Sequence, residues 1–222
     1  MDALSSFVFV VGNVGQSAIK CVYITFIHNG WSGLGLLRSG EVGSLKRKVC
    51  MLMSILTRDE IIREVESGRI KIDPFVKDAI GPASIDLRLD NKFRVFKKIN
   101  ETFDITEDAN YEHVTEYLEV DDRFLLLPGE SVLGITLERL TLPGDVCGWL
   151  EGRSRFARVG LTVHVTAGFM QPGISNKQVL EINNVSPIPL YLYPGTFICQ
   201  FIFQKCIGEA QYQGRFADQL KP

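Results

Sequence analysis

The sequence predicts a mainly β protein in which one short helix precedes a series of short strands. Repeated turn signals, alternating apolar residues and one helix-start signal support this prediction. Pro followed by Gly suits a type II turn, because Gly accepts the positive φ angle that the turn requires. Short β-branched and aromatic runs between such turns indicate a sandwich, a jelly roll or a barrel. Four Pro-Gly pairs separate these runs: Pro128-Gly129, Pro143-Gly144, Pro172-Gly173 and Pro194-Gly195.

The helix is predicted to begin at Thr57. Thr57 and Glu60 have the spacing of a capping box, in which the hydroxyl and the carboxylate accept reciprocal backbone N–H bonds. Apolar residues from Ile61 to Val65 share one helical face. Gly68 is placed to end the helix.

The first strand is predicted between Ser84 and Lys98. Apolar side chains from Ile85 to Val95 alternate with polar neighbours, which is the period of a strand with one wet face. Residues 100–123 are acidic and irregular, so we expect a loop or a hairpin excursion there.

Residues 1–52 differ in composition from the rest of the chain. They contain five basic and two acidic residues, a balance of +3, and by subtraction residues 53–222 contain 19 and 24, a balance of −5. The stretch from Gly30 to Gly43 is rich in Gly and Ser and predicts little regular order. The apolar runs before it are too short and too interrupted to cross a bilayer. No basic region precedes the first of them, which argues against a secretory signal.

Three interpretations of residues 1–52 remain open. They form a poorly ordered extension, a targeting segment, or upstream sequence read through from a start codon assigned too early. Met51 and Met53 stand directly before the first helix signal, which favours the third interpretation. We expect the functional domain to span residues 53–222.

Composition excludes several classes of protein. The chain has 222 residues and a formal net charge of −2, which argues against binding nucleic acid through bulk positive charge, although not through a local patch. Five scattered cysteines without a C-x-x-C pair argue against a disulfide scaffold or a zinc knuckle. A reducing, cytoplasmic compartment is the expectation, with no membrane or nucleic-acid partner.

Several common catalytic and cofactor-binding motifs are absent from the sequence. None of the three histidines stands in an H-x-E or H-E-x-x-H string and there is no P-C-x-x-C, so zinc-dependent base deamination is excluded. The Gly-rich strings of dinucleotide folds and P-loops, and the G-x-S-x-G elbow, are missing too.

An arginine-rich string is the first candidate for ligand binding. Residues 152–158 read Gly-Arg-Ser-Arg-Phe-Ala-Arg and place three guanidinium groups and the Ser154 hydroxyl within six positions. Guanidinium presents a planar fork of donors that suits phosphate. The alternative is a solvated surface turn, and Arg155 in particular fits that interpretation.

Glu181 is the second candidate, because it interrupts an otherwise apolar run in a predicted core strand. A buried carboxylate costs several kcal/mol unless it is paired or protonated. One explanation is a structural ion pair with an arginine such as Arg158. The other is a proton shuttle whose pKa is raised by burial.

Several strings, in this order along the chain, resemble the dCTP deaminase family within the dUTPase-like superfamily. The resemblance covers about Met53 to Arg215. The strings are Pro82 to Leu89 (PASIDLRL), Gly152 to Arg158, His164 to Phe169 (HVTAGF), Val179 to Glu181, Pro194-Gly195 and Tyr212 to Gly214.

The resemblance implies a distorted β jelly roll that assembles as a homotrimer with active sites at the subunit boundaries. It implies hydrolysis of dCTP to dUTP and ammonia, with no metal at the base and with Mg²⁺ accompanying the triphosphate. By motif, Glu181 matches the general acid/base, while Ser154 and Arg158 match the residues that hold the water and the carboxylate. The implied substrate-binding residues are Arg153, Ser154, Arg155, Arg158, Ala167, Gln171, Val179, Leu180, Glu181, Gln200, Tyr212 and Arg215.

This assignment makes chemical sense without zinc. One flexible carboxylate can take a proton from water, deliver one to ring N3 and place one on the departing amine. Donors such as Ser154 and Arg158 can hold the water in line. A carboxylate in an apolar strand is expected to have a raised pKa, so that Glu181 occupies both protonation states near neutrality.

Departures from the family pattern leave the product open. Gln171 stands where most members have an Asp, and a neutral amide is no base, which puts dUTP diphosphatase activity in doubt. Gly168-Phe169 and Gln200 instead resemble the branch that converts dCTP to dUMP. A dUTP diphosphatase, a bifunctional dUMP-forming enzyme and a nucleotide-binding module that has lost turnover therefore remain alternatives.

Two further residues have more than one interpretation. Asp86 either ties down a turn or contacts the ligand. His164 fits a hydrogen-bonded core residue better than a catalyst.

Overall fold

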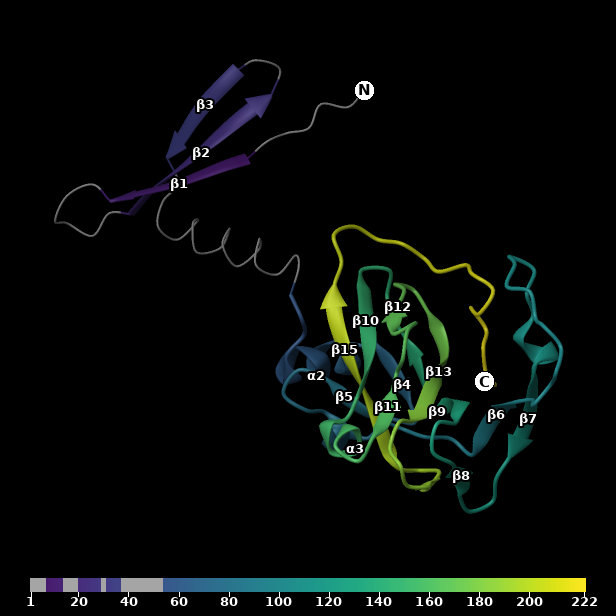
Figure 1. Ribbon diagram of the computed structural model, residues 1–222. Coiled ribbons are helices and arrows are strands. Elements are labelled where there is room, and N and C mark those ends of the chain that lie inside the picture. Colours follow the sequence, from purple (N-terminus) through teal and green to yellow (C-terminus); the bar gives the residue numbers. More distant parts are fainter. Residues whose placement is uncertain (1–6, 14–19, 29–30, 37–53) are drawn as a thin grey trace. The chain divides into compact units, whose positions relative to one another are not determined.

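The computed structural model describes residues 7–13, 20–28, 31–36 and 54–222 (Figure 1). The chain divides into two units, Met1–Met53 and Ser54–Pro222. In the first unit, β1 (Phe7–Asn13), β2 (Lys20–His28) and β3 (Trp31–Leu36) form an antiparallel sheet in the order β1-β2-β3. Strand β3 lies in the stretch predicted to have little regular order, so that prediction is wrong for residues 31–36. Met51 and Met53 lie outside the described residues.

The predicted helix is present as α2 (Arg58–Glu66), with Thr57 as its extended N-cap residue. The capping-box prediction is wrong, because the Thr57 side chain makes no capping hydrogen bond and Arg63 binds the Glu60 carboxylate instead, at 2.7 Å. Gly68 ends the helix as predicted, with a φ of 75° and its N–H donating to the Val65 carbonyl. In the part of the chain that the structure describes, no helix is long and apolar enough to span a bilayer.

Strands are the main regular elements of the second unit, and they form two main antiparallel sheets. One sheet has the order β12-β10-β15-β5, and the other has the order β11-β13-β9-β6-β7 with β4 added beside β9. A two-stranded sheet pairs β14 with β8. The elements are β4 (Lys71–Asp73), the 3₁₀ turn η2 (Lys77–Ala79), β5 (Ile85–Arg88), β6 (Lys92–Phe96), the 3₁₀ turn η3 (Tyr111–His113), β7 (Thr115–Glu119), β8 (Phe124–Leu126), β9 (Ser131–Thr141), β10 (Val146–Gly152), the short helix α3 (Ser154–Ala157), β11 (Leu161–Val163), β12 (Phe169–Met170), β13 (Ser175–Asn184), β14 (Leu190–Leu192) and β15 (Phe197–Lys205).

The predicted strand at 84–98 is divided into β5 and β6, which belong to different sheets. The predicted alternation is nevertheless confirmed, because Ile85, Leu87 and Phe93 are all fully buried or nearly so. The acidic excursion at 100–123 returns as β7, which pairs antiparallel with β6 and confirms a hairpin.

Three of the four Pro-Gly pairs have the predicted left-handed glycine: φ is 77° at Gly129, 75° at Gly173 and 83° at Gly195. Gly144 differs, since its φ lies outside the left-handed region. A Cβ at Gly144 would lie 3.0 Å from the carbonyl oxygen of Ala210. Close packing against the C-terminal segment therefore explains this glycine better than a type II turn does.

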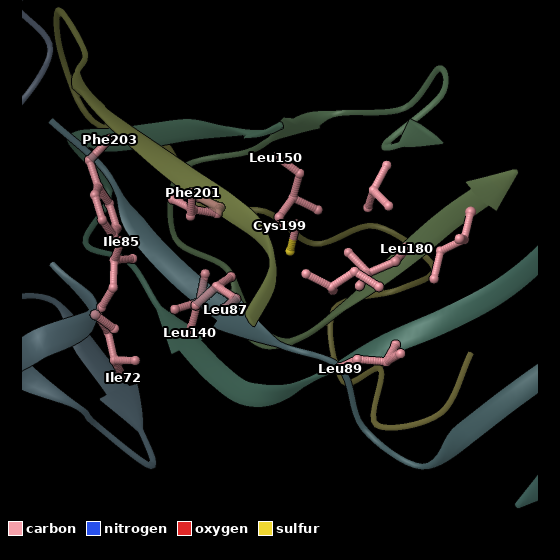
Figure 2. Close-up of a cluster of buried hydrophobic side chains, with 14 of the residues drawn as sticks. Ile72, Ile85, Leu87, Leu89, Leu140, Leu150, Leu180, Cys199, Phe201 and Phe203 are labelled. Atoms are coloured by element: carbon pink, nitrogen blue, oxygen red, sulfur yellow. The ribbon is translucent and has the colours of Figure 1, made fainter. Parts of the chain in front are cut away.

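The core lies between the two main sheets, and one cluster of buried side chains includes residues of both. Figure 2 shows Phe201 and Phe203 of β15 in the same cluster as Leu140 of β9 and Leu180 of β13. All four side chains are completely buried. The mainly β class predicted from the sequence is confirmed.

Strand β13 has a regular inside-outside alternation along its whole length. Its antiparallel pairing with β9 changes register between Lys177 and Val179. Beyond this irregularity, Leu180 and Ile182 are fully buried in the core, and Glu181 between them faces the other way.

Gly148 of β10 provides a test of how tightly this core is packed. A Cβ at this position would collide with the Phe201 ring and the Ile202 carbonyl oxygen. We expect Gly148→Ala to lower the free energy of unfolding by about 1–3 kcal/mol, the usual cost of overpacking. Urea denaturation at a fixed protein concentration measures this loss. Gly81→Ala is the matched control, because its nearest neighbour would lie at an ordinary 3.4 Å. Equal stability of the two variants would contradict the prediction.

Candidate active site

Glu181 lies on the face of β13 that looks away from the core, and it lines a cavity of about 400 Å³. Its side chain is 26% exposed, whereas its neighbours Leu180 and Ile182 are fully buried. The expectation of a carboxylate buried inside the sheet is therefore wrong. The two-residue period of the strand turns Glu181 toward the cavity, so it does not interrupt the core.

The Glu181 carboxylate is held by the segment that follows β11. The Thr166 backbone N–H donates to Oε2 at 2.6 Å, and the Thr166 hydroxyl lies 3.0 Å from both carboxylate oxygens. His164 Nε2 lies 3.5 Å from Oε2. The ion pair with Arg158 that the sequence left open is not formed in the described chain, where Thr166 and His164 take its place.

These contacts set the charge of Glu181. Burial alone would raise the pKa of the carboxyl group, but the Thr166 N–H, the electrostatic influence of the neighbouring His164 ring and the Thr166 hydroxyl together bring it below its ordinary value of 4.5. The expectation of a raised pKa is corrected accordingly. Glu181 is ionised near neutrality and can accept a proton.

Four other predicted site residues line the same cavity: Ala167, Gln171, Val179 and Tyr212. Leu180 does not, because it is fully buried in the core. Its contribution to the site is the packing that fixes β13.

The arginine cluster forms a second group around α3. Arg153 precedes the helix, pairs with Asp86 of β5 at 2.8 Å and donates to the Phe197 carbonyl oxygen at 2.7 Å. Ser154, Arg155 and Arg158 are exposed. None of these four cluster residues lines the cavity at Glu181. One chain therefore presents the carboxylate and the arginine cluster as two separate groups.

Asp86 and Gln200 make contacts that stabilise the arginine cluster and the residue that precedes it. The Gln200 amide accepts from the Ser84 hydroxyl at 2.9 Å and donates to the Gly152 carbonyl oxygen at 3.2 Å. Burial raises the pKa of Asp86, and the charges of Arg153 and Arg155 only partly oppose this. Asp86 thus fixes the side chain of Arg153, and Gln200 fixes the backbone at Gly152.

The C-terminal segment covers part of the cavity. Asn176 of β13 donates to the Phe216 carbonyl oxygen at 2.7 Å, and the Lys177 N–H donates to the Gln219 carbonyl oxygen at 3.1 Å. Phe216 and Gln219 line the cavity. Arg215 does not line it; its guanidinium group donates to the Ala109 carbonyl oxygen at 3.3 Å.

Sequence reasoning took His164 for a hydrogen-bonded core residue and assigned neither His164 nor Thr166 as a partner of Glu181. Thr166 and His164 stand two positions apart, so an extended segment would place them on one face, and this signal was available. Phe216, Gln219 and Tyr111 of the acidic excursion also line the cavity, and only long-range folding brings them there.

Fold and site together define a class: a mainly β enzyme with an ionised carboxylate in a cavity and a separate cluster of guanidinium groups suited to anions. The family model described as dCTP deaminase-like matches residues 55–206. The chain belongs to the dCTP deaminase-like family of enzymes.

The relatives found by sequence agree with this membership. A protein of Parafrankia sp. (strain EAN1pec) is 41% identical over 178 residues, which cover 76% of this chain and 88% of the relative. A protein of Mycolicibacterium gilvum (strain PYR-GCK) is 42% identical over 160 residues, which cover 71% and 84%. Both are named dCTP deaminase, dUMP-forming.

A solved structure supports the fold. The 2'-deoxycytidine 5'-triphosphate deaminase from Agrobacterium tumefaciens matches with a TM-score of 0.56 at 20% identity, over 69% of this chain and 49% of that chain. The mainly β fold of antiparallel sheets that the resemblance implies is thus similar to the fold of a solved dCTP deaminase.

Proposed function

We propose that this protein is a dCTP deaminase that replaces the 4-amino group of the base by oxygen and releases ammonia. The observation that carries the proposal is the ionised Glu181 carboxylate, held by Thr166 at the wall of a cavity of about 400 Å³. The names of the relatives support the same substrate.

Glu181 performs the proton transfers in sequence. It first takes a proton from a water molecule as the water oxygen attacks C4 of the cytosine ring. The proton passes to N3, and a tetrahedral intermediate forms at C4. The carboxylate then removes the second proton of the former water and delivers it to the amine, the C4–N bond breaks, and dUTP and ammonia leave. Water supplies every atom that the product gains.

Ser154 and Arg158 are proposed to hold the attacking water and the carboxylate. Because neither lines the cavity in its own chain and both are exposed, a second copy of the protein has to supply them. A homotrimer with sites at its subunit boundaries meets this requirement. Each boundary then combines Glu181 of one subunit with the arginine cluster of the next.

The triphosphate is proposed to bind the arginine cluster, with Arg153, Arg155 and Arg215 as donors to its oxygens. Magnesium is expected to accompany the triphosphate and to neutralise part of its charge. Asp86 is the carboxylate beside the cluster, but Arg153 already engages one of its oxygens. The magnesium ion is therefore expected to be held mainly by the phosphates.

The immediate product is proposed to be dUTP. Cleavage to dUMP needs a base for a second water, and Gln171, at the cavity wall, offers only a neutral amide. The names of the relatives favour the second candidate, a dUMP-forming enzyme.

Product analysis separates the candidates. With dCTP we expect ammonia and dUTP in equal amounts and no pyrophosphate, and with dUTP we expect no reaction. Ammonia, pyrophosphate and dUMP are measured in one incubation, with Gln171→Asp as the matched variant that restores the acidic group. Equal amounts of ammonia and pyrophosphate from the unmodified protein would assign the dUMP-forming reaction. Binding of dCTP without either product would assign a nucleotide-binding module.

A further inference from the structure

His164 lies beside Glu181, and one nitrogen of its ring takes no part in the hydrogen bonds described above. The side chain is 4% exposed and lines the same cavity as Glu181. Its Nε2 atom is buried and makes no hydrogen bond within residues 54–222. A buried polar atom without a partner costs free energy, so its retention calls for an explanation.

The backbone of β13 fixes which nitrogen of His164 carries the proton. The Glu181 N–H donates to Nδ1 at 3.2 Å, so Nδ1 acts as an acceptor and has no hydrogen. A neutral imidazole then carries its proton on Nε2. The Nε2 atom lies 3.5 Å from Oε2 of the Glu181 carboxylate, so the backbone and the side chain of Glu181 both face this ring.

The surroundings keep the ring neutral. Burial lowers the pKa of His164, and this outweighs the opposing influence of the Glu181 charge, the Ala167 backbone and the Glu151 charge. A neutral ring donates a hydrogen bond without adding a full positive charge. Glu181 therefore gains a donor and remains basic enough to accept a proton from water.

We propose that His164 is a positioning residue for Glu181. The His164 Nε2–H donates a hydrogen bond to the Glu181 carboxylate when the Glu181 side chain turns from Thr166 toward the substrate. This inference rests on the proposed function, because it assigns the orientation of the group that moves the protons. Thr166 and His164 then act as two alternative donors, and the carboxylate moves between them as it takes up and delivers protons.

Two substitutions separate positioning from a purely structural role. His164→Gln places an amide N–H near the position of Nε2 but lacks an acceptor at Nδ1. His164→Asn keeps an acceptor near Nδ1 for the Glu181 N–H, but it is too short to reach the carboxylate. A structural role therefore favours Asn as the substitute, and the positioning role favours Gln.

We expect His164→Asn to lower kcat for ammonia release from dCTP by about 10- to 100-fold with little change in KM, as for a misplaced catalytic group. His164→Gln should stay within about 5-fold of the unmodified protein, since its donor is retained. Thermal unfolding of both variants checks that they fold. Equal losses in the two variants, or a larger loss in His164→Gln, would overturn the proposal.

The acid limb of the pH profile adds a readout that loss of stability does not move. Removing the donor in His164→Asn should raise the pKa of Glu181, so the acid limb of kcat/KM shifts to higher pH. Carboxyl ¹³C NMR of glutamate-labelled protein measures the same rise without turnover, so this test also holds if the protein does not deaminate dCTP. An unchanged Glu181 pKa in His164→Asn would refute the positioning role alone, whereas absence of ammonia from the unmodified protein would refute the proposed function.

Discussion

Replacing Glu181 by Gln is expected to reduce ammonia release from dCTP by at least about 1,000-fold, within the range of general acid–base catalysis. The amide has nearly the same shape as the carboxylate, but it cannot take a proton from water. Binding of dCTP should remain within a few fold, because the phosphate donors belong to the arginine cluster. Ammonia release at saturating dCTP and calorimetric titration of dCTP measure the two quantities.

Glu116→Gln is the matched control for this experiment. Glu116 lies on β7, is exposed and does not line the cavity at Glu181. The control should retain full activity. Turnover of Glu181→Gln at a rate near that of the control would remove Glu181 from the mechanism.

Mixing two inactive variants is expected to restore activity if neighbouring subunits share each site. Glu181→Gln lacks the base, and Arg158→Ala lacks the proposed partner from the arginine cluster. In a mixed cyclic trimer one boundary of three combines an intact Glu181 with an intact Arg158, so mixed assemblies isolated through both tags should have about a third of the wild-type rate, and an unselected random mixture about a quarter. Co-expression with two different affinity tags yields the mixed assemblies, and their ammonia release gives the answer.

The control for this experiment pairs Glu181→Gln with a chain that carries both substitutions. No boundary in that mixture contains Glu181, so no activity should return. Failure of the first mixture to regain activity, with mixed assemblies present, would show that each chain completes its own site.

Local patterns predicted the fold class, the helix that follows Thr57 and the strand signal between Ser84 and Lys98. Ile85 and Leu87 alternate with polar residues, and the structure buries them as that period requires. The division of this stretch into β5 and β6 was not visible, because a change of sheet depends on what packs around the chain. The capping box at Thr57 failed for a similar reason, since Arg63 competes for the Glu60 carboxylate.

The sequence predicted which residues form the candidate site better than it predicted how those residues are arranged. The strings around Ser154 and Glu181 identified the two groups, but not their separation within one chain. The pKa of Glu181 was expected to rise, because an apolar run was taken to mean burial on both faces of the strand. The donors of Thr166, which reverse that shift, come from a segment 15 residues away in the sequence.

The unbroken two-residue alternation of β13 restricts which changes of length the strand can accept. Leu180 and Glu181 serve the core and the cavity from adjacent positions, because β13 keeps its two-residue alternation without a break, even where its pairing with β9 is irregular between Lys177 and Val179. Insertion or deletion of a single codon in the second half of the strand would exchange the two, sending a charge inward and an aliphatic side chain to the nucleotide. Length polymorphism among natural variants should therefore concentrate in the connections before and after β13, and the strand itself should tolerate only replacement.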